Sequence, residues 1–313
     1  MRDNSEDRAP LPVEGSLAEV SDPSKPLRNS ALAELSDLDR GDVQVLRRLW
    51  GKVAVERRRE IVSRLAELAE DNFGLDFDRV FLSALEDTDP QVRARAATGL
   101  NLCQDAVVIA PLVMLLTKDE SGAVRIAAAQ TLGKFILLGE LEKAPQSEAE
   151  RARQALLSVL EDKKQDRELR RRALESISPW TFDRVTEHIA NFYRSAEPGF
   201  KASAIYSMGM NCDARWLPAL FSELKNSDPR LRYEAAHAVG EVGEQSAVPH
   251  LAPLLRDDDI EVRVAAIWAL GEIGGKAARE ALRLLALVPD ARVKDAVEQA
   301  LSDISLGEDV ISP

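Results

Sequence analysis

Cysteine and aromatic residues are scarce in this chain of 313 residues, and each shortage excludes a class of structure. Cys103 and Cys212 are the only cysteines, which excludes a disulfide framework. We expect both to be buried free thiols inside apolar helical segments. Aromatic residues make up 5% of the chain, which argues against a core built from sheets. Abundant Ala, Leu, Glu and Arg favour helix instead.

Long apolar runs are missing as well. No stretch reaches the roughly 18 apolar residues that a membrane-spanning helix needs. Residues 1–14 are charged and contain proline, unlike a secretory signal, whose centre is apolar. We therefore expect a cytoplasmic protein that does not bind a membrane.

The side chains of common catalytic and metal sites are also in short supply. His188, His237 and His250 are the whole histidine inventory, and none forms a His-Glu-x-x-His pair. The glycines at residues 271–275 lack the Lys-Ser/Thr sequence of a phosphate-binding loop. No Ser or Cys has an arguable His partner for nucleophilic catalysis. The sequence therefore predicts no catalytic residue, no metal and no cofactor.

Positive charge is outweighed by negative charge. The net charge is -12, whereas nucleic-acid binding depends on Lys and Arg that neutralise phosphates. Basic runs at residues 57–59 and 170–172 each begin a helix among acidic neighbours, so we expect them to be solvated or ion-paired. The charge predicts a protein or peptide partner and no nucleic acid.

An internal repeat is the strongest feature of the sequence. Basic anchor residues recur every 31 positions at Arg170, Lys201, Arg232, Arg263 and Lys294. Earlier copies are centred on Arg58, Arg93 and Arg125. The interval from Arg125 to Arg170 is 45, and we assign its 14 surplus residues to an inserted polar loop at residues 138–150.

Each copy carries the same sequence of signals. An acidic, often proline-bearing turn comes first and is typical of a helix start. Small residues follow three and four places after the anchor, and a larger apolar residue follows at seven, all on one face of a helix. Glycines then mark a helix end, and a further amphipathic helix follows. The pattern predicts an all-α, right-handed α-solenoid of about eight helical hairpins.

The strings Asp-Pro-x-Val-Arg-x-x-Ala-Ala at residues 89–97 and, with Leu for Val, at 228–236 resemble the HEAT-repeat family. The closer resemblance is to its short bacterial variant, the phycobilisome-lyase-type HEAT-like repeat. The chain also resembles deoxyhypusine hydroxylase, a HEAT-like family that binds iron through His-Glu dipeptides. The matching place here is Tyr233-Glu234, so that activity is not expected.

The resemblance implies a HEAT-like solenoid over residues 31–304. Residues 1–30 hold four prolines and no periodicity, which predicts a disordered arm, and residues 305–313 are predicted to be a short tail. The repeated anchor arginines could form an anion-binding ladder. The resemblance favours a structural role instead, in which each Arg bonds acidic or carbonyl groups of adjacent hairpins.

One exposed stripe stands out as a binding surface. Positions one, five and nine after each anchor point away from the packed face, and on HEAT-like second helices this is the concave side. Three consecutive repeats place Tyr206, His237 and Trp268 at position five. The candidate partner-binding set is completed by four neighbours, Met210, Tyr233, Glu241 and Glu272. Aromatic and Met residues are typical anchors of interfaces. The alternative is that the rings fold down onto neighbouring helices as core.

Three functions are compatible with these observations. The first is a non-enzymatic scaffold or adaptor that binds a protein or peptide on its concave face. The second, which rests on the resemblance, is a phycobilin-lyase-like chromophore lyase or chaperone. The third is a regulatory subunit whose arm at residues 1–30 folds on a partner. The sequence does not indicate an oligomeric state.

Overall fold

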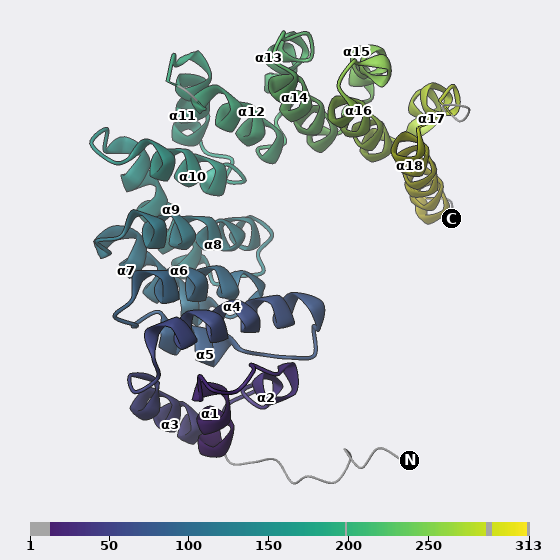
Figure 1. Cartoon of the computed structure of the whole chain (residues 1–313). Coiled ribbons are helices and arrows are strands. Elements are labelled where there is room, and N and C mark those ends of the chain that lie inside the picture. Colours follow the sequence, from purple (N-terminus) through teal and green to yellow (C-terminus); the bar gives the residue numbers. More distant parts are fainter. Residues whose placement is uncertain (1–12, 198, 286–289, 312–313) are drawn as a thin grey trace, which may run out of the picture. The chain divides into compact units, whose positions relative to one another are not determined.

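A computed structural model describes residues 13–197, 199–285 and 290–311, and these residues form helices and connecting turns without a β-strand. The chain divides into two compact units, Met1–Ser176 and Ile177–Pro313. Each unit consists of helical hairpins in which a first helix is followed by an antiparallel second helix (Figure 1). The fold class predicted from the repeat is confirmed within these ranges.

Unit 1 contains four hairpins, preceded by two short helices. The hairpins are α3–α4, α5–α6, α7–α8 and α9–α10, and the second helices α4, α6 and α8 pack side by side. The helices of this unit are α1 (Val13–Ser21), α2 (Asn29–Ala33), α3 (Arg40–Trp50), α4 (Val55–Asp71), α5 (Asp78–Ala84), α6 (Pro90–Gly99), η1 (Leu100–Leu102), η2 (Ala106–Val108), α7 (Ile109–Lys118), α8 (Gly122–Glu140), α9 (Gln146–Glu161) and α10 (Arg167–Ile177).

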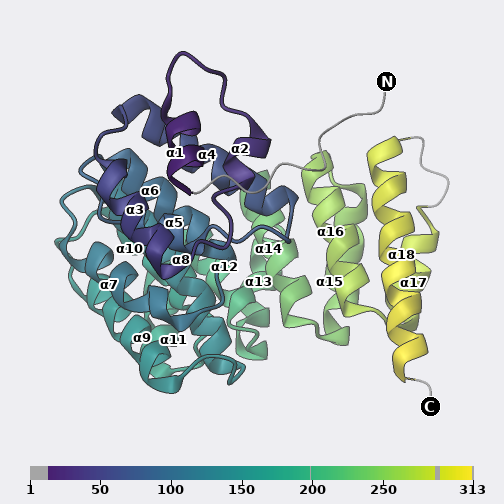
Figure 2. The same cartoon turned by 90° about the horizontal axis from the view of Figure 1, so that it is seen from below.

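Unit 2 contains four further hairpins, so the total of about eight is confirmed. Its second helices are α12, α14, α16 and α18, and Figure 2 shows the last three side by side. The helices are α11 (Asp183–Arg194), α12 (Phe200–Met210), η3 (Ala214–Trp216), α13 (Leu217–Glu223), α14 (Pro229–Val242), η4 (Gln245–Ala247), α15 (Val248–Leu251), η5 (Ala252–Arg256), α16 (Ile260–Ile273), α17 (Gly275–Arg283) and α18 (Ala291–Ile311).

The predicted disordered arm at residues 1–30 is wrong for residues 13–21, which form α1. Val13, Leu17 and Val20 are buried on one face of α1, which packs on α3 and α4. The prolines lie outside α1, so they do not interrupt it. Arg57 on α4 holds the segment further by donating to the carbonyl oxygens of Val20 (2.6 Å) and Lys25 (3.1 Å). Residues 1–12 lie outside the described residues.

The predicted inserted loop at residues 138–150 is also wrong in its extent. Helix α8 continues to Glu140 and α9 begins at Gln146, so only residues 141–145 connect them. The surplus residues lengthen two helices because apolar side chains continue on both sides of the turn. Arg153 on α9 pairs with Glu140 on α8 and ties the two helices together across this turn. The predicted tail at residues 305–313 begins inside α18, which extends to Ile311.

The cysteines confirm one expectation and correct another. Cys103 is buried as predicted, although it follows η1 in a turn rather than lying within a helix. Burial raises the pKa of its thiol to about 12, which keeps it protonated at neutral pH. Cys212 is exposed, which contradicts the prediction of a buried thiol. It lies in the turn after α12 with a φ of 51°, because the chain reverses direction there.

The acidic turns cap the second helices as the sequence predicts. The Asp89 carboxylate accepts from the backbone amides of Gln91 (3.0 Å) and Val92 (3.1 Å), at the start of α6. Asp228 accepts from the amide of Arg230 at the start of α14 in the same way (3.0 Å). Such caps satisfy amides that have no partner within the helix, and each stabilises a helix by about 1 kcal/mol.

The repeated arginines have the structural role that the resemblance implies. Arg93 makes two hydrogen bonds to the carboxylate of Asp119 in the next turn, of 2.8 and 2.9 Å. Arg232 donates to both carboxylate oxygens of Asp257, in the turn of the next repeat, at 2.7 Å each. Both arginines also donate to carbonyl oxygens of their own turn. The guanidinium therefore ties one hairpin to the next.

An ion pair between Arg59 and Asp89 in unit 1 makes the stability of the fold sensitive to acid. Arg59 on α4 bonds the carboxylate of Asp89 across the hairpin boundary (3.0 Å for Nε), and this contact lowers the pKa of Asp89 to about 2. A carboxyl group with a lowered pKa in the folded state stabilises the fold above its unfolded pKa of about 3.9. That stabilisation is lost as the pH falls from about 4 to about 2.

We expect Arg59→Gln to raise the pKa of Asp89 and to shift acid unfolding to higher pH. The measurement is a carboxyl-carbon NMR titration of Asp89, together with urea unfolding at several values between about pH 2 and 5. Arg64→Gln, which removes an exposed arginine from the same helix, is the control. An unchanged pKa of Asp89 in Arg59→Gln would show that the helix cap alone lowers it.

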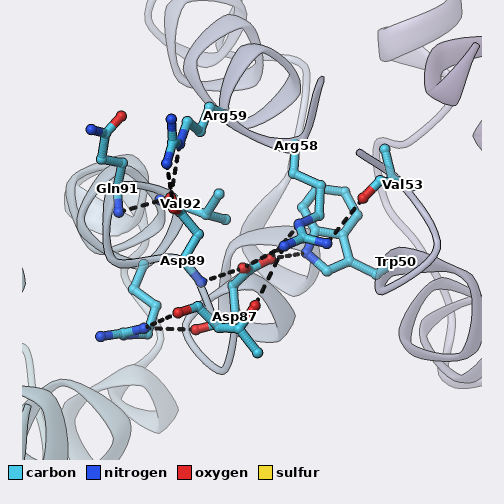
Figure 3. A network of polar contacts seen from close by, with 10 residues as sticks. Trp50, Val53, Arg58, Arg59, Asp87, Asp89, Gln91 and Val92 are labelled. Carbon is cyan, nitrogen blue, oxygen red and sulfur yellow. Dashed lines mark hydrogen bonds and ion pairs between the residues drawn. The ribbon is translucent and has the colours of Figure 1, made fainter. Parts of the chain in front are cut away.

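A buried polar network joins the first two hairpins of unit 1 (Figure 3). The Asp87 carboxylate accepts from the indole Nε1 of Trp50 (2.6 Å) and pairs with Nε of Arg58 (2.9 Å). Arg58 also donates to the carbonyl oxygen of Val53 (3.0 Å). The side chains of Asp87 and Arg58 are 2% and 9% exposed, so these polar groups depend on one another rather than on water.

Second helices approach closely where a glycine stands eight places after the anchor. A Cβ added at Gly209 would lie 2.6 Å from Cα of Ala238, and one at Gly240 would lie 2.8 Å from Cα of Ala269. The same contact recurs between Gly271 and Ala300. Each pair is 29 residues apart, so α12, α14, α16 and α18 follow one another in a constant register.

Candidate functional site

The predicted stripe lies on three successive second helices of unit 2. Tyr206 and Met210 come from α12. Tyr233, His237 and Glu241 come from α14, and Trp268 and Glu272 come from α16. Their side chains are exposed or half-buried, because positions one, five and nine face away from the packed first helices. The constant register of these helices brings the stripe residues onto one face.

Five of the seven predicted residues line an open groove between α12 and α14. The groove has a volume of about 270 Å³ and is lined by Tyr206, Met210, Tyr233, Glu234, His237, Ala238 and Glu241. Trp268 and Glu272 are not among its lining residues and continue the same face on α16. The sequence reasoning missed Glu234, which stands two places after the anchor and carries no signal in the three-position pattern.

Three rings form a continuous row from α14 to α16. The ring of His237 lies 4.7 Å from that of Tyr233 and 4.5 Å from that of Trp268, measured between centroids. Trp268 is half-buried, and a Cβ added at Gly240 would lie 2.8 Å from its ring. Trp268 therefore does pack on the neighbouring helix, as the core alternative proposed, whereas Tyr206 is 43% exposed.

Burial controls the charge of the groove. It lowers the pKa of His237, so this imidazole is neutral at pH 7 and adds no positive charge to the face. Burial also raises the pKa of Glu241, and the nearby carboxylate of Glu272 raises it further. Neither carboxylate has an ion pair within the part of the chain that the structure describes, so the aromatic face has a negative electrostatic potential.

The groove of unit 1 has a different character. It lies over α6, α8 and α10, and its volume is about 750 Å³. Arg95, Gln130 and Arg172 are among its lining residues, and small side chains such as Ala94 and Ala123 also line it. The sequence reasoning missed this groove because small and polar residues on a solvent-facing helix give no distinctive pattern.

Metal-ligand clusters and membrane-spanning helices are two features that the described residues lack. No group of three or more His, Cys, Asp or Glu side chains is placed to hold a metal ion within the residues that the structure describes. No helix among residues 13–197, 199–285 and 290–311 is both long enough and apolar enough to cross a membrane.

The sequence matches the family of HEAT repeats over residues 79–178, 186–260 and 217–302. These matches span well over half of the chain, and the chain therefore belongs to the HEAT-repeat family. No curated protein matches the chain in sequence. The family identity confirms the prediction made from the Asp-Pro-x-Val-Arg-x-x-Ala-Ala strings.

Solved structures resemble the chain in fold. A chain of the Kap95p–RanGDP structure superposes with a TM-score of 0.50 at 12% identity, over 93% of this chain and 45% of that chain. The CpcE–CpcF complex of phycocyanin lyase from Nostoc sp. PCC7120 gives 0.48 at 18% identity, over 72% and 94%. Human deoxyhypusine hydroxylase gives 0.33 at 19% identity, over 94% and 97%. The first of these shows the α-solenoid fold, and the bilin-lyase hypothesis stays a prediction.

Proposed function

We propose that this protein is a non-enzymatic scaffold that holds a protein or peptide partner along the second-helix face of unit 2. The observation that carries the proposal is the aromatic groove between α12 and α14, continued by Trp268 on α16. A HEAT-repeat solenoid supports it, because stacked hairpins leave an extended face available to a partner.

The side chains of this face are suited to binding. Tyr and Trp supply large contact areas and lose little side-chain entropy on association, which makes them frequent anchors of interfaces. The row of rings from Tyr233 to Trp268 is already held in contact before a partner arrives. A preorganised surface loses less conformational freedom on binding, so more of the contact energy contributes to affinity.

We expect Tyr206→Ala to weaken partner binding by about 2 kcal/mol, or roughly thirtyfold, because a buried aromatic anchor contributes about that much. The thermal unfolding midpoint should change little, since the Tyr206 side chain is 43% exposed in the free protein. Trp268 is a poorer choice for this substitution because it packs against Gly240.

The experiment compares affinity capture from native cells by the wild-type protein, Tyr206→Ala and Phe73→Ala. Phe73 is 90% exposed and lies in unit 1, so it is a matched aromatic control away from the face. The binding constant of the captured protein is then measured for all three. A partner bound equally well by folded Tyr206→Ala would contradict the proposal.

A further inference from the structure

The face that carries the aromatic groove presents the same three positions on four successive helices. Ala202, Tyr233, Val264 and Asp295 are first after the anchor; Tyr206, His237, Trp268 and Gln299 are fifth; Met210, Glu241, Glu272 and Asp303 are ninth. No Lys or Arg occurs at these positions. The ninth position therefore forms a row of three carboxylates on α14, α16 and α18, beside a row of rings.

These three carboxylates differ from most acidic side chains of the repeat turns. Asp257 pairs with Arg232, and Glu223 pairs with Lys201. Glu241, Glu272 and Asp303 have no ion pair within the described residues, although Asp303 accepts a hydrogen bond from Gln299. The raised pKa of Glu241, due first to burial and then to Glu272, is consistent with a carboxylate that lacks a cation.

We propose that this face binds an extended basic segment of another protein, with Arg or Lys at every third residue, so that successive cations meet Glu241, Glu272 and Asp303. This inference rests on the proposed scaffold function and specifies its partner. The negative charge of the three carboxylates favours a positively charged segment. The spacing of the helices determines how far apart its cationic residues must be.

The spacing follows from the constant register of the second helices. Packed helices lie about 8–10 Å apart, so equivalent carboxylates on α14, α16 and α18 are separated by about that distance. An extended chain advances about 3.1–3.3 Å per residue. Three residues therefore cover the distance from one second helix to the next. Polyproline II brings every third side chain to the same side, whereas a β-strand alternates sides. The segment is expected in the polyproline II conformation.

The rings give the cations at Glu241 and Glu272 a second contact. His237 and Glu241 are four residues apart on α14, as are Trp268 and Glu272 on α16, so a ring and a carboxylate lie one helical turn apart. A guanidinium can stack on an aromatic face while its N–H groups donate to a carboxylate. Arg is therefore expected to bind more tightly than Lys.

The test uses two synthetic peptides of about ten residues with the same composition, the length needed to cross four helices. One repeats Arg-Pro-Ala, and the other groups its arginines at one end. Binding to the full chain is measured by fluorescence anisotropy at about 0.15 M salt, where unspecific attraction is screened. We expect the evenly spaced peptide to bind at least about tenfold more tightly. Equal binding of the two peptides would overturn the proposed spacing.

The variant Glu241→Gln with Glu272→Gln tests the acidic row directly. Removing two charges that contact the segment should weaken binding of the evenly spaced peptide by at least about tenfold. The control is Glu244→Gln with Glu280→Gln, which changes the net charge by the same amount. Both residues are exposed and lie outside the first, fifth and ninth positions of the repeat, so this double variant should bind the peptide nearly as well as the wild type. Equal losses in the two double variants would overturn the inference, because attraction would then depend on net charge alone.

The two proposals can fail separately. If neither peptide binds, yet Tyr206→Ala still loses the captured partner, the occupant is not a basic segment and the scaffold function stands. If the evenly spaced peptide binds and the captured partner is indifferent to Tyr206→Ala, the acidic row is a binding site and the aromatic groove is not the partner's anchor.

Discussion

Replacing Asp87 by Ala is expected to lower the free energy of unfolding of unit 1 by about 3–5 kcal/mol, the usual loss when one partner of a buried ion pair is removed. The substitution leaves the Arg58 guanidinium, which is 9% exposed, without its carboxylate. It also leaves the indole N–H of Trp50 without its acceptor. Both groups are buried, so neither can turn to water without displacing the side chains packed around it.

Urea unfolding followed by circular dichroism measures this loss, and the Trp50 indole provides a local fluorescence signal. Glu86→Ala is the control, since Glu86 is the adjacent acid and its side chain is 74% exposed. Asp87→Asn keeps an acceptor for Trp50 and removes the charge opposite Arg58, so an intermediate loss is expected. A loss below about 1 kcal/mol for Asp87→Ala would mean that water replaces the carboxylate.

Replacing Gly240 by Ala should destabilise unit 2 by about 1–3 kcal/mol, as overpacked sites do, although Ala alone favours a helix by about 1 kcal/mol. The new methyl group would lie 2.8 Å from Cα of Ala269 and 2.8 Å from the ring of Trp268. Backbone atoms cannot rotate away, so α14 and α16 must separate. The same movement would displace the row of rings.

The measurement is the thermal unfolding midpoint. Gly122→Ala at the start of α8 is the matched control, because a Cβ there meets no atom within 4 Å. That substitution should be neutral or slightly stabilising, since it restricts the unfolded chain. A stabilised Gly240→Ala variant would show that the helix contact has room for a methyl group.

The stripe residues were predictable because the 31-residue translation fixes which helix face each position occupies. Tyr206, His237 and Trp268 share a position in the repeat, and the structure places them on neighbouring helices of one face. Extending the same translation from Glu272 leads to Asp303, which the sequence reasoning did not use. Glu234 could not be found in this way, since it lines the groove from a position two places after the anchor, outside the three-position pattern.

The errors in the sequence interpretation share a cause. Prolines in residues 1–30 suggested disorder, but the four-residue spacing of Val13 and Leu17 provides an apolar face that α3 and α4 cover. The polar residues after Leu138 suggested a loop, but buried Ala149 and Ala152 continue as a helix against α8. In both segments the local sequence has only a weak preference for disorder or a loop. Packing against apolar residues from elsewhere in the chain stabilises a helix instead.

By itself, the sequence determined the repeat, the caps at Asp89 and Asp228, the ties made by the anchor arginines and the family. These features depend on groups within one hairpin or one repeat of each other, so their spacing along the chain encodes them. Only the tertiary structure decided that α1 docks, that the 14 surplus residues lengthen α8 and α9, and that Trp268 lies against Gly240. Those outcomes depend on which apolar surfaces, distant in the sequence, are buried against one another. The local sequence does not encode that pairing.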